Sequence, residues 1–349
     1  MLYWRFDRAI CWQRVTRWRR HSGILSPTNF DLRQTENTPY EFGDPLSTPI
    51  AVVVLAFNEE ANLEACLDSV KGWSREVFVV DSYSTDRTVD IALSRAGDGV
   101  RVVQHSFEDY SKQWNWALRA LPISAPWTLK LDADERVTIE FKAEVEALLK
   151  TASAEMEGVY FRRRFHFMGR KLRWLGEVGY DLRLWRTGTA VFEDRSVNEH
   201  ALINGRAGYL KSYVDHYDYK STTDWIDKHN RYASLEAHHI INGKVLGGVR
   251  ARFWGTPDER RVWLRLLYRK LPAGPAFYLL YLYFIRMGFL DGRAGLHYCL
   301  LRAEYFFWIE LKRLEHKATG RLPDVVWPMR GAPHPAVAAS ELQRRVDGA

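Results

Sequence analysis

Cysteine is scarce in this chain of 349 residues, which contains only three. Cys11, Cys66 and Cys299 stand far apart, so they form neither a disulfide framework nor a Cys-x-x-Cys metal site. This excludes the small disulfide-stapled class of secreted domains and the cysteine-ligated zinc modules. A reducing, cytoplasmic setting is the plainest interpretation.

Long apolar runs are also missing from the sequence. The longest aromatic and aliphatic run spans residues 276–285, bounded by Pro275 and Arg286, and is half of the roughly 20 residues that a membrane-spanning helix needs. The first twenty residues hold six arginines against one aspartate, with no apolar core or small-residue cleavage site after them. We therefore expect neither a spanning helix nor a secretory signal.

Aromatic residues and positive charge are, in contrast, plentiful. There are 14 Trp and 17 Tyr, and the formal net charge is +7. Such charge suits nucleic acid, anionic lipid or a phosphorylated partner, because all three offer anionic groups to Arg and Lys. Nucleic acid is not expected, since no recognised binding module accompanies the charge. The mixture of aromatic and Arg-rich segments in the N-terminal and C-terminal thirds suits an anionic membrane surface.

From residue 50 onward, short apolar runs alternate with amphipathic segments. The pattern predicts strands at 50–56, 76–81, 100–104 and 127–131, and helices at 60–71, 87–96, 110–121 and 138–149. Such alternation predicts an α/β fold, with a parallel sheet made of right-handed strand–helix–strand units.

Three of these strands end in polar, acidic stretches, at residues 55–60, 79–88 and 129–135. Ligands of open α/β sheets bind at the carboxyl ends of the strands, so we expect these carboxylates to gather at one such edge. Asp132 and Asp134 stand two positions apart, and hard oxygen ligands of this kind suit Mg²⁺ or Mn²⁺ carrying a nucleotide diphosphate. The alternative is a strand-end turn without a ligand, in which two neighbouring acids would repel each other.

Seven short motifs together carry a family resemblance: Asn58-Glu59-Glu60, Asp81-Ser-x-Ser-Thr-Asp86, Lys112-Gln-x-Asn115, Asp132-Ala-Asp134, Val197-Asn-Glu199, His216-Tyr217 and Gly288-Phe-Leu-Asp-Gly292. On these residues the chain resembles, from about residue 50 to 316, a family 2 glycosyltransferase of the GT-A fold, and most of all the bacterial branch that includes lipopolysaccharide inner-core glucosyltransferases. The resemblance implies a Rossmann-like, mostly parallel sheet flanked by helices, with a C-terminal helical extension. It also implies inverting, metal-dependent transfer of a sugar such as glucose from a nucleotide-sugar such as UDP-glucose. The implied acceptor is an envelope glycan or a lipid-linked one, with the lipopolysaccharide core first among them.

The resemblance implies a donor-binding role for the first two acidic stretches. In the family, the aspartate matching Asp81 and the glutamate of the Asn-Glu-Glu stretch hold the uracil and ribose of the donor. A carboxylate suits this role because it accepts the N–H and O–H hydrogens of a nucleoside. The implied donor-binding set is Ala56, Asn58, Glu59, Asp81, Ser82, Asp86, Lys112, Asn115, Asp132 and Arg183. A local alternative is that Asp86 and Thr85 cap a helix beginning at Arg87.

The resemblance also implies a metal site. The acid matching Asp134 ligates Mg²⁺ or Mn²⁺, the acid matching Asp132 touches ribose or metal-bound water, and His216 is a third ligand of metal or phosphate. A divalent cation neutralises the charge that grows on the departing diphosphate, which gives Asp134 a catalytic role. The alternative for His216 is a packed, hydrogen-bonded histidine among aromatic neighbours.

Direct displacement at an anomeric carbon needs a base that takes the proton of the acceptor hydroxyl. Glu199 is the candidate, with Asp194 and Glu193 as rivals, and surface acids on a loop as the alternative. The resembling branch shows Val-His-Glu where this chain has Val197-Asn198-Glu199, so an expected neighbour of the base is missing.

A basic run at residues 162–173 suits phosphate groups of the acceptor, because arginine binds phosphate through two N–H groups at once. The alternative is a solvated basic face. The shorter, more aromatic strands after residue 155 are expected to form the acceptor half of the site.

Composition divides the chain into four regions. Residues 1–48 are a basic, aromatic extension and linker, 49–245 the GT-A domain, 246–320 a helical region, and 321–349 a mobile tail rich in Pro and Ala. The helical region either lies in the membrane interface or forms a buried subdomain. We expect a cytoplasmic protein attached peripherally to the inner face of the cytoplasmic membrane.

Two other functions fit parts of the sequence. A strand followed by Asp-x-Asp also resembles the nucleophile motif of haloacid-dehalogenase-type phosphatases. That motif has Thr or Val two residues after the second Asp, whereas this chain has Arg136 there. A non-catalytic assembly protein at the membrane surface would keep the fold and the basic, aromatic ends, but the intact acidic set argues against it.

Overall fold

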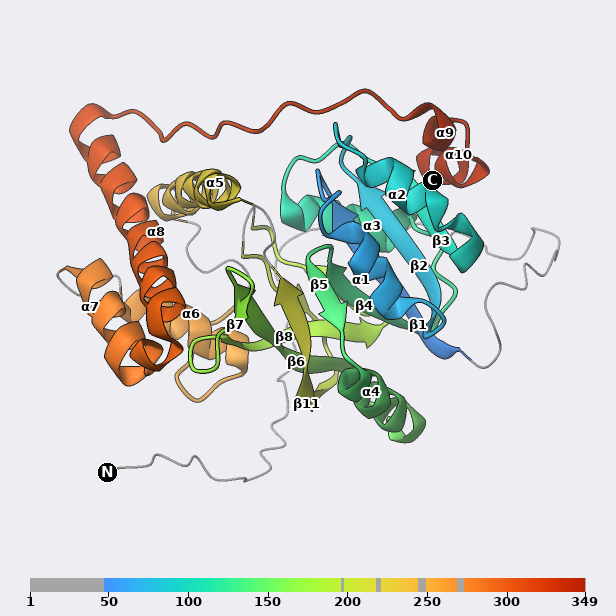
Figure 1. The fold of residues 1–349 in the computed structure, drawn as a ribbon, viewed down its shortest axis with the longest axis horizontal. Coiled ribbons are helices and arrows are strands. Elements are labelled where there is room, and N and C mark those ends of the chain that lie inside the picture. The colour runs from blue at the N-terminus through green and yellow to red at the C-terminus, as the bar shows by residue number, and fades with distance from the viewer. Residues whose placement is uncertain (1–46, 196–197, 218–220, 244–248, 269–272, 349) are drawn as a thin grey trace, which may run out of the picture.

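The structure is a computed structural model that describes residues 47–348, except 196–197, 218–220, 244–248 and 269–272. The basic extension expected over residues 1–48 lies outside the described residues, apart from its last two positions. Figure 1 shows an α/β half, a group of helices beside it, and a C-terminal segment that passes from one to the other.

One mixed sheet organises the α/β half, with strands in the order β3-β2-β1-β4-β8-β6-β11-β5 and with β7 paired to β6. Its strands are β1 (Thr48–Ala56), β2 (Ser74–Asp81), β3 (Val100–Gln104), β4 (Trp127–Asp132), β5 (Glu135–Val137), β6 (Met156–Phe167), β7 (Arg170–Lys171), β8 (Glu177–Arg186) and β11 (Arg206–Tyr217). A separate pair is formed by β9 (Val191–Phe192) and β10 (Ala201–Leu202). β3, β2, β1 and β4 are mutually parallel, and so are β6 and β11, while β8 runs antiparallel between the two blocks. These two blocks therefore point the same way, which confirms the mostly parallel α/β sheet.

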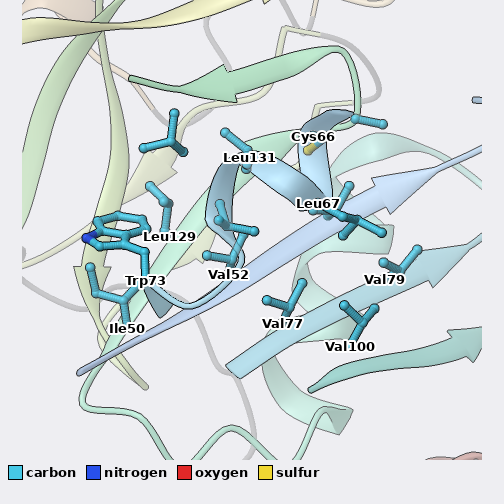
Figure 2. Packing of buried hydrophobic residues seen from close by; sticks show 14 of the residues in the cluster. Ile50, Val52, Cys66, Leu67, Trp73, Val77, Val79, Val100, Leu129 and Leu131 are labelled. Atoms are coloured by element: carbon cyan, nitrogen blue, oxygen red, sulfur yellow. The ribbon is translucent and has the colours of Figure 1, made fainter. Parts of the chain in front are cut away.

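Successive side chains of β1 point to opposite faces of this sheet, as they do along any strand. Ile50, Val52 and Val54 join one core cluster, whereas Ala51 and Val53 join another, and all five are fully buried. Figure 2 shows part of the first cluster, where residues of β1, β2 and β4 meet the buried side of α1. Burial on both faces explains why these strands are continuously apolar in sequence.

Four helices flank the sheet near their predicted positions. α1 (Leu63–Val70), α2 (Thr88–Ser94) and α4 (Ile139–Thr151) contribute to the first cluster, and α3 (Tyr110–Ala120) contributes to the second. Side-chain caps fix where two of them begin, since Asp109 accepts an N–H at the start of α3 and Thr138 accepts one at the start of α4.

A helical extension lies beside the sheet (Figure 1). It contains α5 (Thr222–Ile241), α6 (Pro257–Tyr268), α7 (Gly274–Leu280), a π-helical turn η2 (Tyr281–Ile285), a 3-10 turn η3 (Gly288–Asp291) and α8 (Gly292–Thr319). α5 packs along α8 through Ala233, Tyr305 and Ile309, so it groups with the extension. α5 also contacts the α/β half through the buried ion pair of Glu236 with Arg195, and the boundary that the sequence places at residue 245 stays a prediction. Within the described ranges, no helix is both long enough and apolar enough to cross a bilayer.

Two contacts fasten the extension together and to the α/β half. The carboxylate of Asp291 accepts three successive backbone N–H groups of residues 173–175, at 2.7 to 3.3 Å. α8 meets η3 so closely that a Cβ on Gly295 would lie 2.2 Å from the carbonyl oxygen of Gly288. The motif at residues 288–292 is thus a structural junction.

After α8 comes the segment from residue 321, which the sequence predicts to be a mobile tail. It crosses to the far edge of the sheet (Figure 1) and ends in α9 (Pro335–Ala338) and α10 (Glu341–Asp347), which pack against β3. Val337 and Val346 are buried, one in each core cluster. The sequence gives little sign of this, because the anchoring apolar side chains are few.

Candidate active site

The carboxyl ends of β1, β2 and β4 lie side by side at one edge of the sheet. Ala56 is in register with Asp81 across β1 and β2, and Leu55 is in register with Asp132 across β1 and β4. His216 reaches this edge from β11, where it pairs with Glu135 of β5, just after the turn that follows β4. The acidic strand ends therefore gather as parallel pairing requires.

Asp132 is held by arginine. Its Oδ2 accepts a hydrogen bond from Arg183 Nη2 at 2.8 Å and lies 3.8 Å from Arg163 Nη1. Arg183 Nη1 also donates to both oxygens of the fully buried Glu135, at 2.9 and 2.8 Å. Burial alone raises the pKa of Asp132, but the positive charges of Arg183, Lys130 and Arg163 outweigh burial and hold it well below its usual range. Asp132 remains partly accessible, with 35% of its side chain exposed.

Asp134 and His216 face each other next to this cluster. Oδ2 of Asp134 lies 3.3 Å from Nε2 of His216. The other carboxylate oxygen, Oδ1, is buried and has no hydrogen-bond partner. Burial lowers the pKa of His216, but the negative charges of Asp134 and Glu135 outweigh burial and raise the pKa above its ordinary value. An unsatisfied carboxylate oxygen beside an imidazole fits a divalent cation, which also takes substrate phosphates and water as ligands.

The expected set of three metal ligands is only partly assembled. In the part of the chain that the structure describes, no three His, Cys, Asp or Glu side chains are grouped to hold one ion. Asp134 and His216 meet, whereas Asp132 is engaged by Arg183. Sequence spacing places two acids at a strand end, but it does not reveal a guanidinium that competes for one of them.

Asp81 is completely buried at the end of β2. Its Oδ1 accepts the hydroxyl of Ser84, and its Oδ2 accepts Gln104 Nε2 at 2.7 Å and the Ser84 backbone N–H at 3.1 Å. Burial raises the pKa of Asp81 above its ordinary value. Ser82 is buried beside it, with its hydroxyl 3.4 Å from Gln113 Nε2. Asp81 thus shapes the loop that follows β2, and direct contact with a nucleoside requires its neighbours to move.

Asn58, Glu59 and Asp86 join the loops that follow β1 and β2. Asn58 has a φ of 52°, and its Oδ1 accepts the Thr85 backbone N–H at 2.8 Å. The backbone N–H of Glu59 donates to Thr88 Oγ1 at 2.7 Å. Asp86 accepts the backbone N–H of Thr88, the first residue of α2, at 3.0 Å, whereas Arg87 is the N-cap residue and makes no side-chain capping hydrogen bond. These contacts fix the shape of the two loops.

Lys112 and Asn115 of α3 make other contacts. Lys112 pairs with Glu108, and 57% of its side chain is exposed. The side-chain amide of Asn115 exchanges two hydrogen bonds with the backbone of Phe192, at 2.9 and 2.8 Å. Asn115 therefore ties α3 to β9, and neither residue is joined to the acidic strand ends by these contacts.

Glu199 forms an ion pair with Lys130, whose Nζ lies 2.7 Å from Oε1, and only 9% of each side chain is exposed. Lys130 projects from β4 with its ammonium 4.9 Å from the ring centre of Trp114 and 5.0 Å from that of Phe192. Lys130 and Asp132 are alternate residues of one strand and share a face of the sheet. Glu199 is therefore brought to the same side as Asp132.

The rivals of Glu199 lie in different surroundings. Glu193 is buried and binds Nδ1 of His200, so its carboxylate is already engaged. Asp194 is exposed. The geometry favours Glu199 as the base, and this assignment stays a prediction.

Three polar residues of the site are not predicted from the sequence. Lys130 interrupts an apolar strand, which is a usable signal because a charged side chain in a buried strand needs a partner. Glu135 follows Asp134 directly and is a third acid in the same stretch. Gln104 ends a short strand and gives no signal, although it holds Asp81.

The fold and the site together define an α/β enzyme with its polar residues at the carboxyl edge of a mostly parallel sheet. Residues 51–218 match the family described as Glycosyl transferase family 2. A glycosyltransferase of Rickettsia bellii is 34% identical over 217 residues, which are 59% of this chain and 72% of that protein. The chain belongs to glycosyl transferase family 2, and the protein is a glycosyltransferase.

Two further similarities extend over more of the chain. The lipopolysaccharide core biosynthesis glycosyltransferase LpsC of Rhizobium meliloti is 28% identical over 290 residues, 79% of this chain and 96% of that protein. Among solved structures, the mannosyltransferase PcManGT from Pyrobaculum calidifontis, in complex with GDP-Man and Mn2+, is 17% identical with a TM-score of 0.45, over 80% of this chain and 91% of that chain. The expected family and the α/β fold with a helical extension are confirmed.

Proposed function

We propose that this glycosyltransferase moves a sugar, with inversion, from a nucleotide-sugar such as UDP-glucose to a glycan or glycolipid of the cell envelope. The observation that carries the proposal is the pair formed by Asp134 and His216. The unpartnered, buried Oδ1 of Asp134 lies just beyond the carboxyl end of β4, where ligands of α/β folds bind. A carboxylate left unsatisfied at such a place is suited to a ligand that brings positive charge.

Mg²⁺ or Mn²⁺ is the cofactor that these residues suit. Asp134 and His216 would hold the ion, with the donor diphosphate and water as its other ligands. When bound, the ion supplies the positive charge that stabilises a departing diphosphate. Arg183 and Arg163 lie on Asp132 at the same edge and add positive charge of their own.

The donor nucleoside is proposed to lie over the ends of β1 and β2. Asn58 fixes the first loop against the second, and Asp81 holds the residues that follow β2 through Ser84. Both side chains are used in shaping the loops, so we assign them to positioning the nucleoside site rather than to a direct contact.

Glu199 is the proposed general base. The acceptor hydroxyl gives its proton to the Glu199 carboxylate while its oxygen attacks the anomeric carbon from the face opposite the diphosphate. The bond from that carbon to the diphosphate breaks in the same displacement, so the configuration inverts. Lys130 orients the carboxylate through the ion pair at 2.7 Å.

A phosphorylated acceptor, such as the lipopolysaccharide core, suits the hairpin of β6 and β7. Arg163 and Arg164 in the middle of the basic run each bind a carboxylate. Arg170, Lys171 and Arg173, at the tip and just after it, are exposed. Exposed cations of this kind bind phosphate, and the similarity to LpsC supports a core acceptor.

A peripheral position on the inner face of the cytoplasmic membrane accompanies this proposal. The elements α7, η2, η3 and α8 expose large apolar side chains, here called the aromatic face: Phe277, Leu280, Tyr281, Phe284, Ile285, Phe289, Leu290, Leu296 and Leu300. Arg293 is exposed among them. Apolar side chains that enter the interface and cations that meet anionic head groups together give peripheral attachment.

Release of nucleoside diphosphate tests the proposed function. We expect the full chain with Mn²⁺ to release UDP slowly from UDP-glucose, or the matching diphosphate from another donor in a panel. Asp134→Ala should reduce release by about 10²-fold or more, whereas Glu304→Gln, at an exposed position of α8, should leave it unchanged. Phosphate release from a monoester would favour the phosphatase instead, and inactivity toward every donor would favour the assembly protein.

A further inference from the structure

The segment after α8 is fastened at both ends. Near its start, the carbonyl of Pro323 accepts a hydrogen bond from Nε2 of His238 in α5 at 2.6 Å. Near its end, the side-chain amide of Gln343 exchanges hydrogen bonds with the backbone of Gln104 in β3, at 2.8 and 3.1 Å. Between these anchors the chain crosses from the helical extension to the sheet (Figure 1). Residues 327–334 of this crossing are called the strap below.

The strap contacts the loop that follows β2. The backbone N–H of Gly331 donates to the carbonyl of Tyr83 at 2.8 Å. A Cβ on Gly331 would lie 2.9 Å from the carbonyl oxygen of Ser84, so the strap approaches this closely only with glycine. Tyr83 has a φ of 60°, which is unfavourable for a bulky residue and persists only where its surroundings impose it. The strap therefore helps to hold the loop in its shape.

Gln104 connects the strap to Asp81. Its Nε2 donates to Asp81 Oδ2 at 2.7 Å, and its Oε1 accepts the backbone N–H of His334 at 2.6 Å. One buried side chain thus spans the acid at the end of β2 and the strap. The position of the strap and the geometry of the nucleoside site are coupled through this contact.

Arg330 places a cation at the same edge. Its Nη1 donates to the carbonyl of Phe107 at 2.8 Å. The guanidinium carbon lies 5.6 Å from the ring centre of Phe57 and 4.9 Å from that of Phe107. Trp327 packs edge-on against Phe107, with ring centres 5.2 Å apart. Because Phe57 directly follows the last residue of β1, this group stands beside the ends of β1 and β2.

We propose that the strap forms one wall of the nucleoside pocket and that Arg330 is a donor-binding residue that contacts the nucleobase. This inference rests on the proposed function. A guanidinium carries five N–H donors on a planar group, and it both stacks on flat rings and donates to carbonyl oxygens. Uracil offers a flat ring with carbonyl oxygens at its edge, so it matches both properties. The strap contributes to donor affinity and takes no part in the displacement.

The affinity of the full chain for UDP, measured by calorimetry with Mg²⁺, tests the inference. Arg330→Ala should weaken UDP binding by about tenfold, because it removes a hydrogen bond from a charged group. Arg330→Gln keeps a polar side chain with N–H donors but loses the planar cation, and it should also weaken binding. Arg344→Ala is the matched control, since Arg344 is an exposed arginine of α10. Arg330→Ala should weaken the binding of UMP, measured without metal, to a similar degree, because the proposed contact is to the base.

Each outcome decides a separate point. Equal UDP affinity for wild type and Arg330→Ala would overturn the inference and leave the proposed function standing. Weakening of UDP but not of UMP would overturn the assignment to the base. If Arg330→Ala lowers the melting temperature without nucleotide, Arg330→Gln decides, and an unchanged affinity in that variant contradicts the role. A wild-type chain that binds neither UDP nor another donor diphosphate would contradict the proposed function, and this inference with it.

Discussion

Glu199 and Lys130 form an ion pair in which only 9% of each side chain is exposed. Glu199→Gln removes the negative charge but keeps an oxygen that accepts a hydrogen bond from Lys130. We expect UDP affinity to stay the same and sugar transfer to fall about 10²-fold to 10⁴-fold, which is the usual contribution of a general base. Calorimetry with UDP and initial rates of transfer measure the two effects.

Asp194→Asn is the matched control, because Asp194 is the exposed rival on the same segment. Its transfer rate should stay near that of the wild type. An active Glu199→Gln together with an inactive Asp194→Asn would move the base to Asp194.

At the residue scale, the sequence predicts which polar residues reach the edge of the sheet better than it predicts their partners. Asp132, Asp134 and His216 all lie at the edge that strand pairing defines, and Asp134 and His216 contact each other there. The partners of the acidic residues come from other parts of the chain: Arg183 of β8 binds Asp132, and Gln104 of β3 binds Asp81. The end of a strand determines where an acidic residue lies in the fold. The hydrogen-bond partners of its carboxylate depend on residues far away in the sequence.

At the element scale, the junction between η3 and α8 depends on the absence of a side chain at Gly295. Gly295→Ala would place a Cβ 2.2 Å from the Gly288 carbonyl oxygen, so the two elements must separate. We expect the free energy of unfolding to fall by about 1–3 kcal/mol, as for other overpacked sites. Urea denaturation measures the change.

Gly97→Ala provides the control for that measurement. A Cβ on Gly97 meets nothing within 4 Å, and Gly97 is not among the residues with a positive φ. Its stability should stay within about 0.5 kcal/mol of the wild type. Equal effects of the two substitutions on the free energy of unfolding would show that the close approach at Gly295 does not contribute to stability.

The regular elements of the α/β half follow from sequence period and capping. The strand Val100–Gln104 and the start of α3 at Tyr110 agree with their predicted positions. The packing of α5 on α8 and the docking of α9 and α10 on β3 do not follow in the same way. Helical period shows which side of a helix is buried, but not which element covers it.

At the scale of the whole molecule, the aromatic face predicts binding to anionic vesicles. Ile285 is 72% exposed on this face, and Ile139 is 82% exposed on α4. Ile285→Asp should weaken vesicle binding by about tenfold or more, because it removes an apolar side chain from the interface and adds negative charge. Ile139→Asp should leave binding unchanged in the same cosedimentation assay. Equal vesicle binding by the wild type and Ile285→Asp would contradict the assignment of this face.

The central claim is that Asp134 and His216 hold a divalent cation against the donor diphosphate. Crystals of the full chain grown with UDP and Mn²⁺ test it most directly, because manganese gives an anomalous signal. We expect an anomalous peak for a manganese ion bound by the Asp134 carboxylate and the His216 imidazole, with the diphosphate of UDP on its other side. Bound UDP with manganese held by other residues, or with no manganese at Asp134, would contradict it.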